Sequence, residues 1–200
     1  MRSRSPWPFY WWSIVLLVIL AGAVALDWVA WLSGGLPDRL PKTLAASARG
    51  QTMVTLYFAS RDATGVVPET RRIPAEKTEA ALAARLVEAL IAGPHDQRLQ
   101  RTIPPGTRLL SLTIANQIAY VNFSQEIRSH HWGGSAGELI TTASIVNTLT
   151  QLPGIRAVQL ELDGRRVESI WGHGDTSRPI QRMDDLIIPP PGSPGPDATQ

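Results

Sequence analysis

A continuous apolar stretch near the N-terminus constrains this chain more than any other feature of its sequence. Residues 9–26 are apolar and are interrupted only by Ser13. A stretch of this length can span the hydrocarbon core of a bilayer, which is about 30 Å thick. Arg2 and Arg4 precede it, and basic residues favour the cytoplasmic side of a membrane. We therefore predict a single-pass cell-membrane protein whose C-terminal part is extracytoplasmic.

The tryptophans support a retained membrane anchor over residues 1–33. Indole rings favour the headgroup level of a bilayer. A cleaved leader is the alternative, because residues 23–25 (Ala-Val-Ala) have the small-x-small form that a signal peptidase accepts. Both interpretations place the rest of the chain outside the cytoplasm. Five of the seven tryptophans lie at the two ends of the apolar stretch: Trp7, Trp11, Trp12, Trp28 and Trp31.

The amino-acid composition excludes several classes of function and separates a linker, a globular domain and a tail. The absence of cysteine excludes disulfides, thiol nucleophiles and a lipidated N-terminal cysteine. A formal net charge of +2 gives no electrostatic footprint for nucleic acid. Glycine and proline mark residues 34–50 as a linker, and a proline-rich composition predicts a disordered tail over 184–200. Residues 51–183 are left as one globular domain.

Within this domain, hydrophobic periodicity predicts an α+β fold. Two-residue alternation indicates strands, and the Asp163-Gly164 pair signals a tight hairpin turn. Two amphipathic helices with half-buried strands favour a mostly antiparallel sheet with both helices packed on one face. The predicted strands cover residues 52–59, 65–73, 110–114, 118–123, 155–162 and 167–171.

The helix boundaries are predicted from capping residues. Thr78 is a suitable N-cap for a helix that runs to Ala92 and ends before Gly93-Pro94. Ser135 and Glu138 have the spacing of a capping box for a second helix. We expect Asn147, inside that helix, to be a structural residue that bonds backbone groups at strand ends. The apolar face of the second helix is predicted to contain Leu139, Ala143, Val146 and Leu149.

An ordered set of segments resembles the GerMN domain of the GerM-like sporulation and spore-germination family. Val54-Thr-Leu-Tyr-Phe58 and residues 66–74 resemble the opening of that domain, and Tyr120-Val-Asn-Phe-Ser124 resembles one of its strand ends. The resemblance covers about residues 51–183. Further matching segments are residues 90–94, 103–107, 145–149, 152–155, 158–159 and 163–164.

The resemblance implies a small, exported domain attached as a lipoprotein or by a helix. In sporulating bacteria the tandem form is associated with assembly of a transenvelope channel, and the family has no shared catalytic residues. This chain has one copy of the domain and no lipobox cysteine, and both differences argue against a role in sporulation. We expect a non-catalytic interaction or assembly module of the bacterial envelope, without a cofactor. Its expected partners are an envelope protein or its own copies, and peptidoglycan is a further candidate.

Four residues are candidate binding residues, and each also has a purely structural interpretation. Arg71 and Arg72 could contact an acidic partner or anionic glycan, or could be solvated arginines at a strand edge. Trp132 and Trp171 belong to the core or, if exposed together, form a recognition patch. The alternative functions are a glycan-binding module and a zinc-dependent, peptidoglycan-active enzyme.

Metal binding is not expected. A zinc site needs three or four convergent ligands, and the zinc alternative requires His130 or His131 to meet His173 and an acid. The adjacent histidines at 130 and 131 point to opposite faces if they lie in an extended strand.

Overall fold

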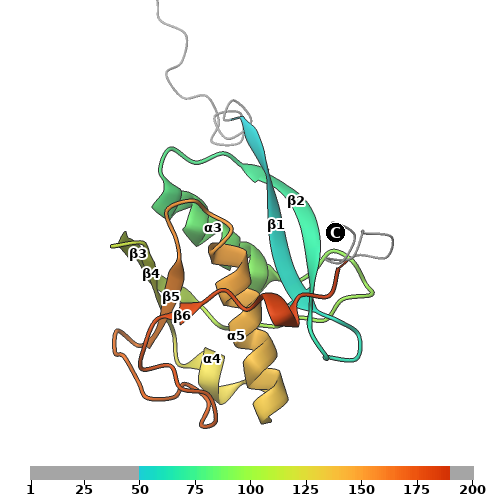
Figure 1. The fold of residues 1–200 in the computed structure, drawn as a ribbon, viewed down its shortest axis with the longest axis vertical. Helices are drawn as coiled ribbons and strands as arrows, with labels where there is room; N and C mark the ends of the chain where they lie inside the picture. Colours follow the sequence, from blue (N-terminus) through green and yellow to red (C-terminus); the bar gives the residue numbers. More distant parts are fainter. Residues whose placement is uncertain (1–49, 190–200) are drawn as a thin grey trace, which may run out of the picture. The chain divides into compact units, whose positions relative to one another are not determined.

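The computed structural model describes residues 50–189 (Figure 1). The chain begins with an antiparallel hairpin of β1 (Gln51–Ala59) and β2 (Val66–Pro74), followed by helix α3 (Glu79–Ala92). A second hairpin, β3 (Leu109–Ala115) and β4 (Ile118–Phe123), precedes the short helix α4 (Glu126–Ser129) and the long helix α5 (Ser135–Leu149). The remaining elements are β5 (Ala157–Leu162), β6 (Ile180–Gln181) and the 3-10 helix η1 (Asp184–Leu186).

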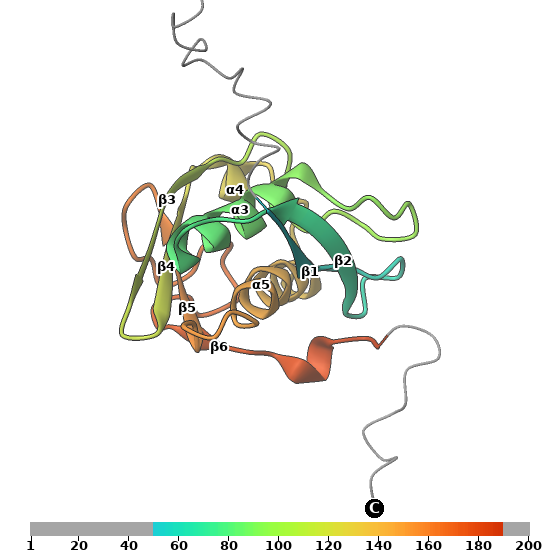
Figure 2. The same ribbon diagram turned by 90° about the horizontal axis from the view of Figure 1, so that it is seen from above.

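The strands form two separate sheets, so the expected α+β class is confirmed but the expected single sheet is not. Strands β1 and β2 form one sheet, and the other has the order β3-β4-β5-β6. Strand β4 pairs in parallel with β5, because the chain between them crosses over through α5. Helices α3 and α5 lie between the two sheets (Figure 2). The helices therefore cover the four-stranded sheet on one side and the β1–β2 hairpin on the other.

The main core lies where these layers meet. Val54, Leu56 and Phe58 alternate along β1 and point into it, as their spacing predicts. On the four-stranded sheet, Val121 of β4 and Leu160 of β5 are paired neighbours, and both side chains are buried in the same core. Helices α3 and α5 therefore each contact both sheets.

Helix α3 matches its prediction closely. The hydroxyl of Thr78 accepts a hydrogen bond from the backbone N–H of Ala81 at 3.2 Å, so Thr78 is the N-cap. Leu86, Val87 and Leu90 are buried on the core face. Gly93 ends the helix with φ of 93°, a conformation that favours glycine.

Helix α5 is buried on more than one side, which its sequence did not predict. Ser144 donates a hydrogen bond to the Tyr57 carbonyl oxygen at 2.5 Å, and the Thr148 hydroxyl accepts one from the Tyr57 N–H at 3.1 Å. Gln151, just beyond the helix, bonds both the N–H and the carbonyl of Thr55. Polar side chains at helical spacing thus satisfy the backbone edge of β1 that faces away from β2.

Two expectations about α5 are wrong. The N-cap is Gly134, with φ of 83° and no side-chain cap bond, so Ser135 is the first helical residue. The Glu138 side chain, predicted to complete a capping box, bonds elsewhere. Leu139 is 43% exposed and not a core residue, because the faces of α5 that contact β1 and the four-stranded sheet lie on its other sides.

The predicted hairpin after β5 forms only its turn. Asp163 and Gly164 have φ of 47° and 76°, as in a tight hairpin turn. The expected strand over residues 167–171 is absent from the described part of the chain. Instead, β6 pairs with Ala157 and Val158 of β5, and the intervening loop is fixed by bonds such as that from the Thr176 N–H to the Glu168 carbonyl, 2.7 Å.

The folded part extends past Met183, where we expected the tail to begin. Residues 180–188 form a C-terminal strap across the β1–β2 hairpin and α5. Leu186 and Ile187 pack on a second apolar cluster, and the Ile188 N–H bonds the Val66 carbonyl at 2.8 Å. Within residues 50–189 there is no helix long and apolar enough to cross a membrane. The expected anchor over residues 1–33 lies outside the described residues.

Candidate docking groove along helix α5

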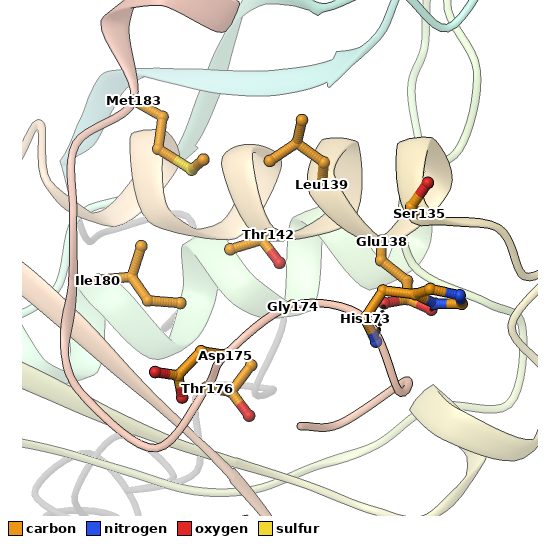
Figure 3. A pocket seen from close by; sticks show the side chains of 10 residues that line it. All are labelled: Ser135, Glu138, Leu139, Thr142, His173, Gly174, Asp175, Thr176, Ile180 and Met183. Atoms are coloured by element: carbon orange, nitrogen blue, oxygen red, sulfur yellow. Dashed lines mark hydrogen bonds and ion pairs between the residues drawn. The ribbon is translucent and has the colours of Figure 1, made fainter. Parts of the chain in front are cut away.

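A groove of about 340 Å³ runs between the outer face of α5 and the chain that returns after β5 (Figure 3). This volume is at the lower end of the range for small-ligand pockets. Leu139 and Thr142 of α5 form one wall, and Ile180 and Met183 of the C-terminal strap contribute apolar side chains to the other. The remaining lining residues are Ser135, Glu138, His173, Gly174, Asp175 and Thr176.

The strap wall is held in place by Asn147 and Arg182. The Asn147 carboxamide bonds the Met183 backbone twice, accepting from its N–H at 2.8 Å and donating to its carbonyl at 3.0 Å. The Arg182 guanidinium donates to the Asn147 carbonyl at 3.1 Å and to the Tyr57 hydroxyl at 3.0 Å. Asn147 thus contacts backbone, as predicted, although its partner is the strap and not a strand end.

Glu138 closes one end of the groove and is only 3% exposed. Its carboxylate accepts hydrogen bonds from the backbone N–H of His173 at 3.1 Å and from the ring Nδ1 of His173 at 2.8 Å. Burial opposes ionisation of Glu138, but these bonds and the His173 charge outweigh it, so the pKa lies below its ordinary value of 4.5. An ionised carboxylate therefore fixes the 172–174 loop against α5.

An aromatic cluster lies beside the N-terminal end of α5. The His131 ring stacks on Trp132 at 5.0 Å between centroids and lies 5.2 Å from the Trp171 ring. Trp132 is 53% exposed, whereas Trp171 is half-buried and donates from Nε1 to the Ile127 carbonyl at 2.8 Å. The two tryptophans predicted as a possible patch therefore come together through His131, but only Trp132 offers an exposed face.

The hydrogen bonds of the His131 ring favour one tautomer. Its Nδ1 accepts from the Gly133 N–H at 3.0 Å, so Nε2 carries the proton toward the Thr141 hydroxyl, 3.0 Å away. Burial lowers the pKa of His131, and the charge of Glu138 opposes this effect without cancelling it. His131 thus supports Trp132 as a structural residue.

The two candidate arginines have different surroundings. The Arg71 side chain is 9% exposed, and its guanidinium bonds Glu69 and the Gly93 carbonyl and lies 5.6 Å from the Phe58 ring centroid. These contacts are internal to the domain. Arg72 is exposed on β2 and is not among the residues that line the groove.

The histidines do not meet in one place. His173 contacts Glu138, His131 contacts Thr141 and Gly133, and His130 is exposed with Nδ1 3.3 Å from the Pro105 carbonyl. Among residues 50–189, no group of three or more His, Cys, Asp and Glu side chains is arranged to hold a metal ion. The convergence that the zinc alternative requires is therefore not found in the described part of the chain.

Sequence reasoning missed the groove itself. It placed Leu139 in the core and did not pair Glu138 with His173, because the two are 35 positions apart. One signal was available: Gly172 and Gly174 flank His173 and allow the backbone to approach a buried carboxylate closely.

Three solved structures have similar folds. A candidate lipoprotein from Clostridium perfringens is 30% identical, with a TM-score of 0.50, and the match covers 70% of this chain and 94% of that one. The tandem GerMN domains of the sporulation protein GerM from Bacillus subtilis are 22% identical, with a TM-score of 0.56 over 67% of this chain. The first GerMN domain of that protein is 22% identical, with a TM-score of 0.51, covering 66% of this chain and 98% of that one.

These similarities define the class as a single GerMN-type domain, which spans 47% of the tandem GerM structure. No curated protein matches the chain in sequence. The Germane family model, described as sporulation and spore germination, matches residues 55–168. The chain belongs to this family, as the resemblance implied.

Proposed function

We propose that this chain is a non-catalytic interaction module of the bacterial cell envelope that docks a protein partner in the α5 groove. The observation that carries the proposal is Leu139, an apolar side chain 43% exposed on a groove wall that Ile180 and Met183 face. Apolar side chains that line a concave surface are typical binding determinants, because a partner's anchor residue can be desolvated there.

The groove chemistry favours docking over catalysis. In the groove, the carboxylate of Glu138 and the imidazole of His173 are in contact. The carboxylate accepts hydrogen bonds from both the ring and the backbone N–H of His173. A general base must be free to accept a substrate proton, whereas the lowered pKa of Glu138 makes its carboxylate a weak base. The Germane family that the chain matches is described by sporulation and spore germination and not by a reaction.

The membrane part of the proposal rests on the sequence and on one relative. The apolar residues 9–26, with Arg2 and Arg4 before them, favour an anchor with the domain outside the cytoplasm. The Clostridium perfringens structure is described as a candidate lipoprotein, which is a membrane-attached class. A tethered domain meets its partners at high local concentration, so a small groove suffices for docking.

A substitution at Leu139 tests the docking proposal. In the full-length chain, Leu139→Asp puts a charge on the groove wall and should reduce the amount of co-purified membrane partner about tenfold, which corresponds to about 1.4 kcal/mol. Met53→Asp is the matched control, because Met53 is 58% exposed on β1 and does not line the groove. Equal recovery with Leu139→Asp and the unchanged chain would reject the groove as the docking site.

Glycan binding is the second candidate, and the exposed face of Trp132 favours it. An aromatic ring with one exposed face offers an apolar surface, and the apolar face of a sugar ring can pack against it. This function needs Trp132 and not Leu139. Loss of binding to isolated wall material with Trp132→Ala, and retention with Leu139→Asp, would favour glycan over protein as the partner.

A further inference from the structure

Most strand edges of the domain are protected by a specific device. The free edge of β1 is satisfied by Ser144, Thr148 and Gln151. On the free edge of β5, β6 pairs with Ala157 and Val158, and the Gln159 side chain donates to the Leu160 carbonyl. Such protection is expected, since an unpaired edge is a template for another strand.

Prolines remove hydrogen-bond donors from the free edge of β2. The Val66 carbonyl bonds the C-terminal strap, so Val66 and every second residue after it direct their backbone groups away from β1. Two of these outward positions are Pro68 and Pro74, which have no N–H to donate. The edge of β2 is therefore a poor template for strand addition.

Strand β3 is the exception. It is the first strand of its sheet, and only β4 pairs with it. The two-residue turn at Asn116 and Gln117, with φ of 51° and 63°, makes Ala115–Ile118 the hydrogen-bonded pair that closes the hairpin. By alternation, Leu112 and Ile114 direct their N–H and carbonyl groups away from β4. Among residues 50–189 these four groups have no partner.

The sequence of β3 contains no residue that opposes pairing with another strand. Leu109–Ala115 contains neither a charge nor a proline. The Leu112 and Ile114 side chains pack on the core, whereas Ser111, Thr113 and Ala115 are exposed, small and uncharged. The edge therefore combines free backbone groups with an outer face that another strand can lie beside without charge repulsion.

We propose that β3 pairs in antiparallel fashion with β3 of a second copy of this chain, about a two-fold axis through Thr113. In this register Leu112 of each copy faces Ile114 of the other, and the two pairs exchange four backbone hydrogen bonds. The two four-stranded sheets become one continuous sheet. This self-association rests on the proposed role in assembly, but it uses a surface separate from the α5 groove.

A second copy suits this edge because the strand complements itself. Antiparallel pairing about Thr113 places Ser111 opposite Ala115, and since Leu109–Ala115 carries no charge, no like charges meet within the paired strands. In a two-fold contact of this kind both copies use the same edge, so assembly through β3 stops at the dimer and no free edge of β3 remains. The pairing is short, because a β-bulge between Leu109 and Ser111 ends the regular register, so weak association is expected.

Engineered cysteines test the register directly, since the 200-residue sequence contains no cysteine. Thr113→Cys places two Cα atoms about 4.5 Å apart across a non-hydrogen-bonded pair, within the range for a disulfide. Ser111→Cys is the matched control, because the two copies of residue 111 are offset by four positions, roughly 13 Å. Under mild oxidation Thr113→Cys should form a dimer at least tenfold faster than Ser111→Cys.

Mixing Ser111→Cys with Ala115→Cys should restore crosslinking, because these two positions face each other in the proposed register. Equal crosslinking of Thr113→Cys and Ser111→Cys, or no dimer with Thr113→Cys, would overturn the proposal. Adding Leu139→Asp to Thr113→Cys should leave the dimer unchanged, so failure of the groove proposal and failure of this one are distinguishable.

A charge-swap experiment adds a readout that does not depend on disulfide chemistry. Thr113 is exposed, so Thr113→Lys and Thr113→Glu should each fold and each resist self-association through like charges at the axis. Equimolar mixing of the two should restore the dimer in sedimentation. A mixture that stays as monomeric as either variant alone would contradict pairing at Thr113.

Discussion

At the scale of single residues, Glu138 illustrates how one buried charge can position the wall of a groove. Its carboxylate is almost inaccessible and binds the His173 ring and backbone across 35 positions of sequence. A buried carboxylate is costly unless it is well hydrogen-bonded, and here the bonds outweigh the cost, since the pKa is lowered. Glu138 therefore stabilises the loop that forms one end of the α5 groove.

Replacing this carboxylate should weaken the fold in a pH-dependent way. Glu138→Gln should lower the free energy of unfolding at pH 7 by about 1.5–3 kcal/mol, the range for hydrogen bonds to a charged group. The folded-state pKa lies below 4.5, so the stabilisation is present above pH 4.5 and is lost as pH falls through the folded-state pKa. Denaturant titrations at several pH values measure both effects.

The exposed Glu88, which pairs with Arg85 on α3, provides the control. Glu88→Gln should change the free energy of unfolding by less than about 0.5 kcal/mol at the same pH values. A loss with Glu138→Gln that stays constant down to pH 2 would contradict an ionised Glu138 in the folded state.

At the scale of elements, helix α5 shows where sequence patterns are sufficient and where they are not. The boundaries of α3, β1 and β4 follow from capping and alternation, because each has one apolar face that its own sequence reveals. Helix α5 contacts a strand edge through Ser144 and Thr148 and the core through Ile145 and Leu149. A polar face that bonds backbone looks like a solvent face in the sequence.

The division into two sheets was not predictable for a related reason. Pairing partners lie far apart in the chain, and β6 has only two residues. Its pairing with β5 replaces the hairpin that Asp163-Gly164 indicated. The candidate site was equally hidden, because Leu139 has the spacing of a core residue and becomes a groove residue only when the strap lies opposite it.

The bond between α5 and the edge of β1 can be tested by removing one hydroxyl. Thr148→Val keeps the shape of the side chain and leaves the buried Tyr57 N–H without its acceptor, so the free energy of unfolding should fall by about 1–3 kcal/mol. Hydrogen exchange at the Tyr57 amide should accelerate with it. Thr142→Val on the groove face of the same helix is the control, with an expected change of less than about 0.5 kcal/mol. Equal effects at the two positions would contradict the role of Thr148.

At the scale of the whole molecule, the two surfaces that we propose for assembly are separate. The α5 groove is formed by a helix and a strap that the core and Asn147 hold in place. The β3 edge lies in the four-stranded sheet and has free backbone groups within the described residues. A domain with one surface for a partner and another for its own copy can link neighbouring molecules in an envelope, which is the role we propose.

The most direct test of this account is crosslinking from inside the groove in intact cells. Thr142→Cys places a single cysteine on the groove wall, since the 200-residue sequence contains no other. A membrane-impermeant, thiol-directed bifunctional crosslinker reaches it only outside the cytoplasm. We predict one discrete adduct with a protein partner that disappears when Leu139→Asp is added and remains when Met53→Asp is added. No adduct, or an adduct that Leu139→Asp leaves intact, would contradict extracytoplasmic docking in the α5 groove.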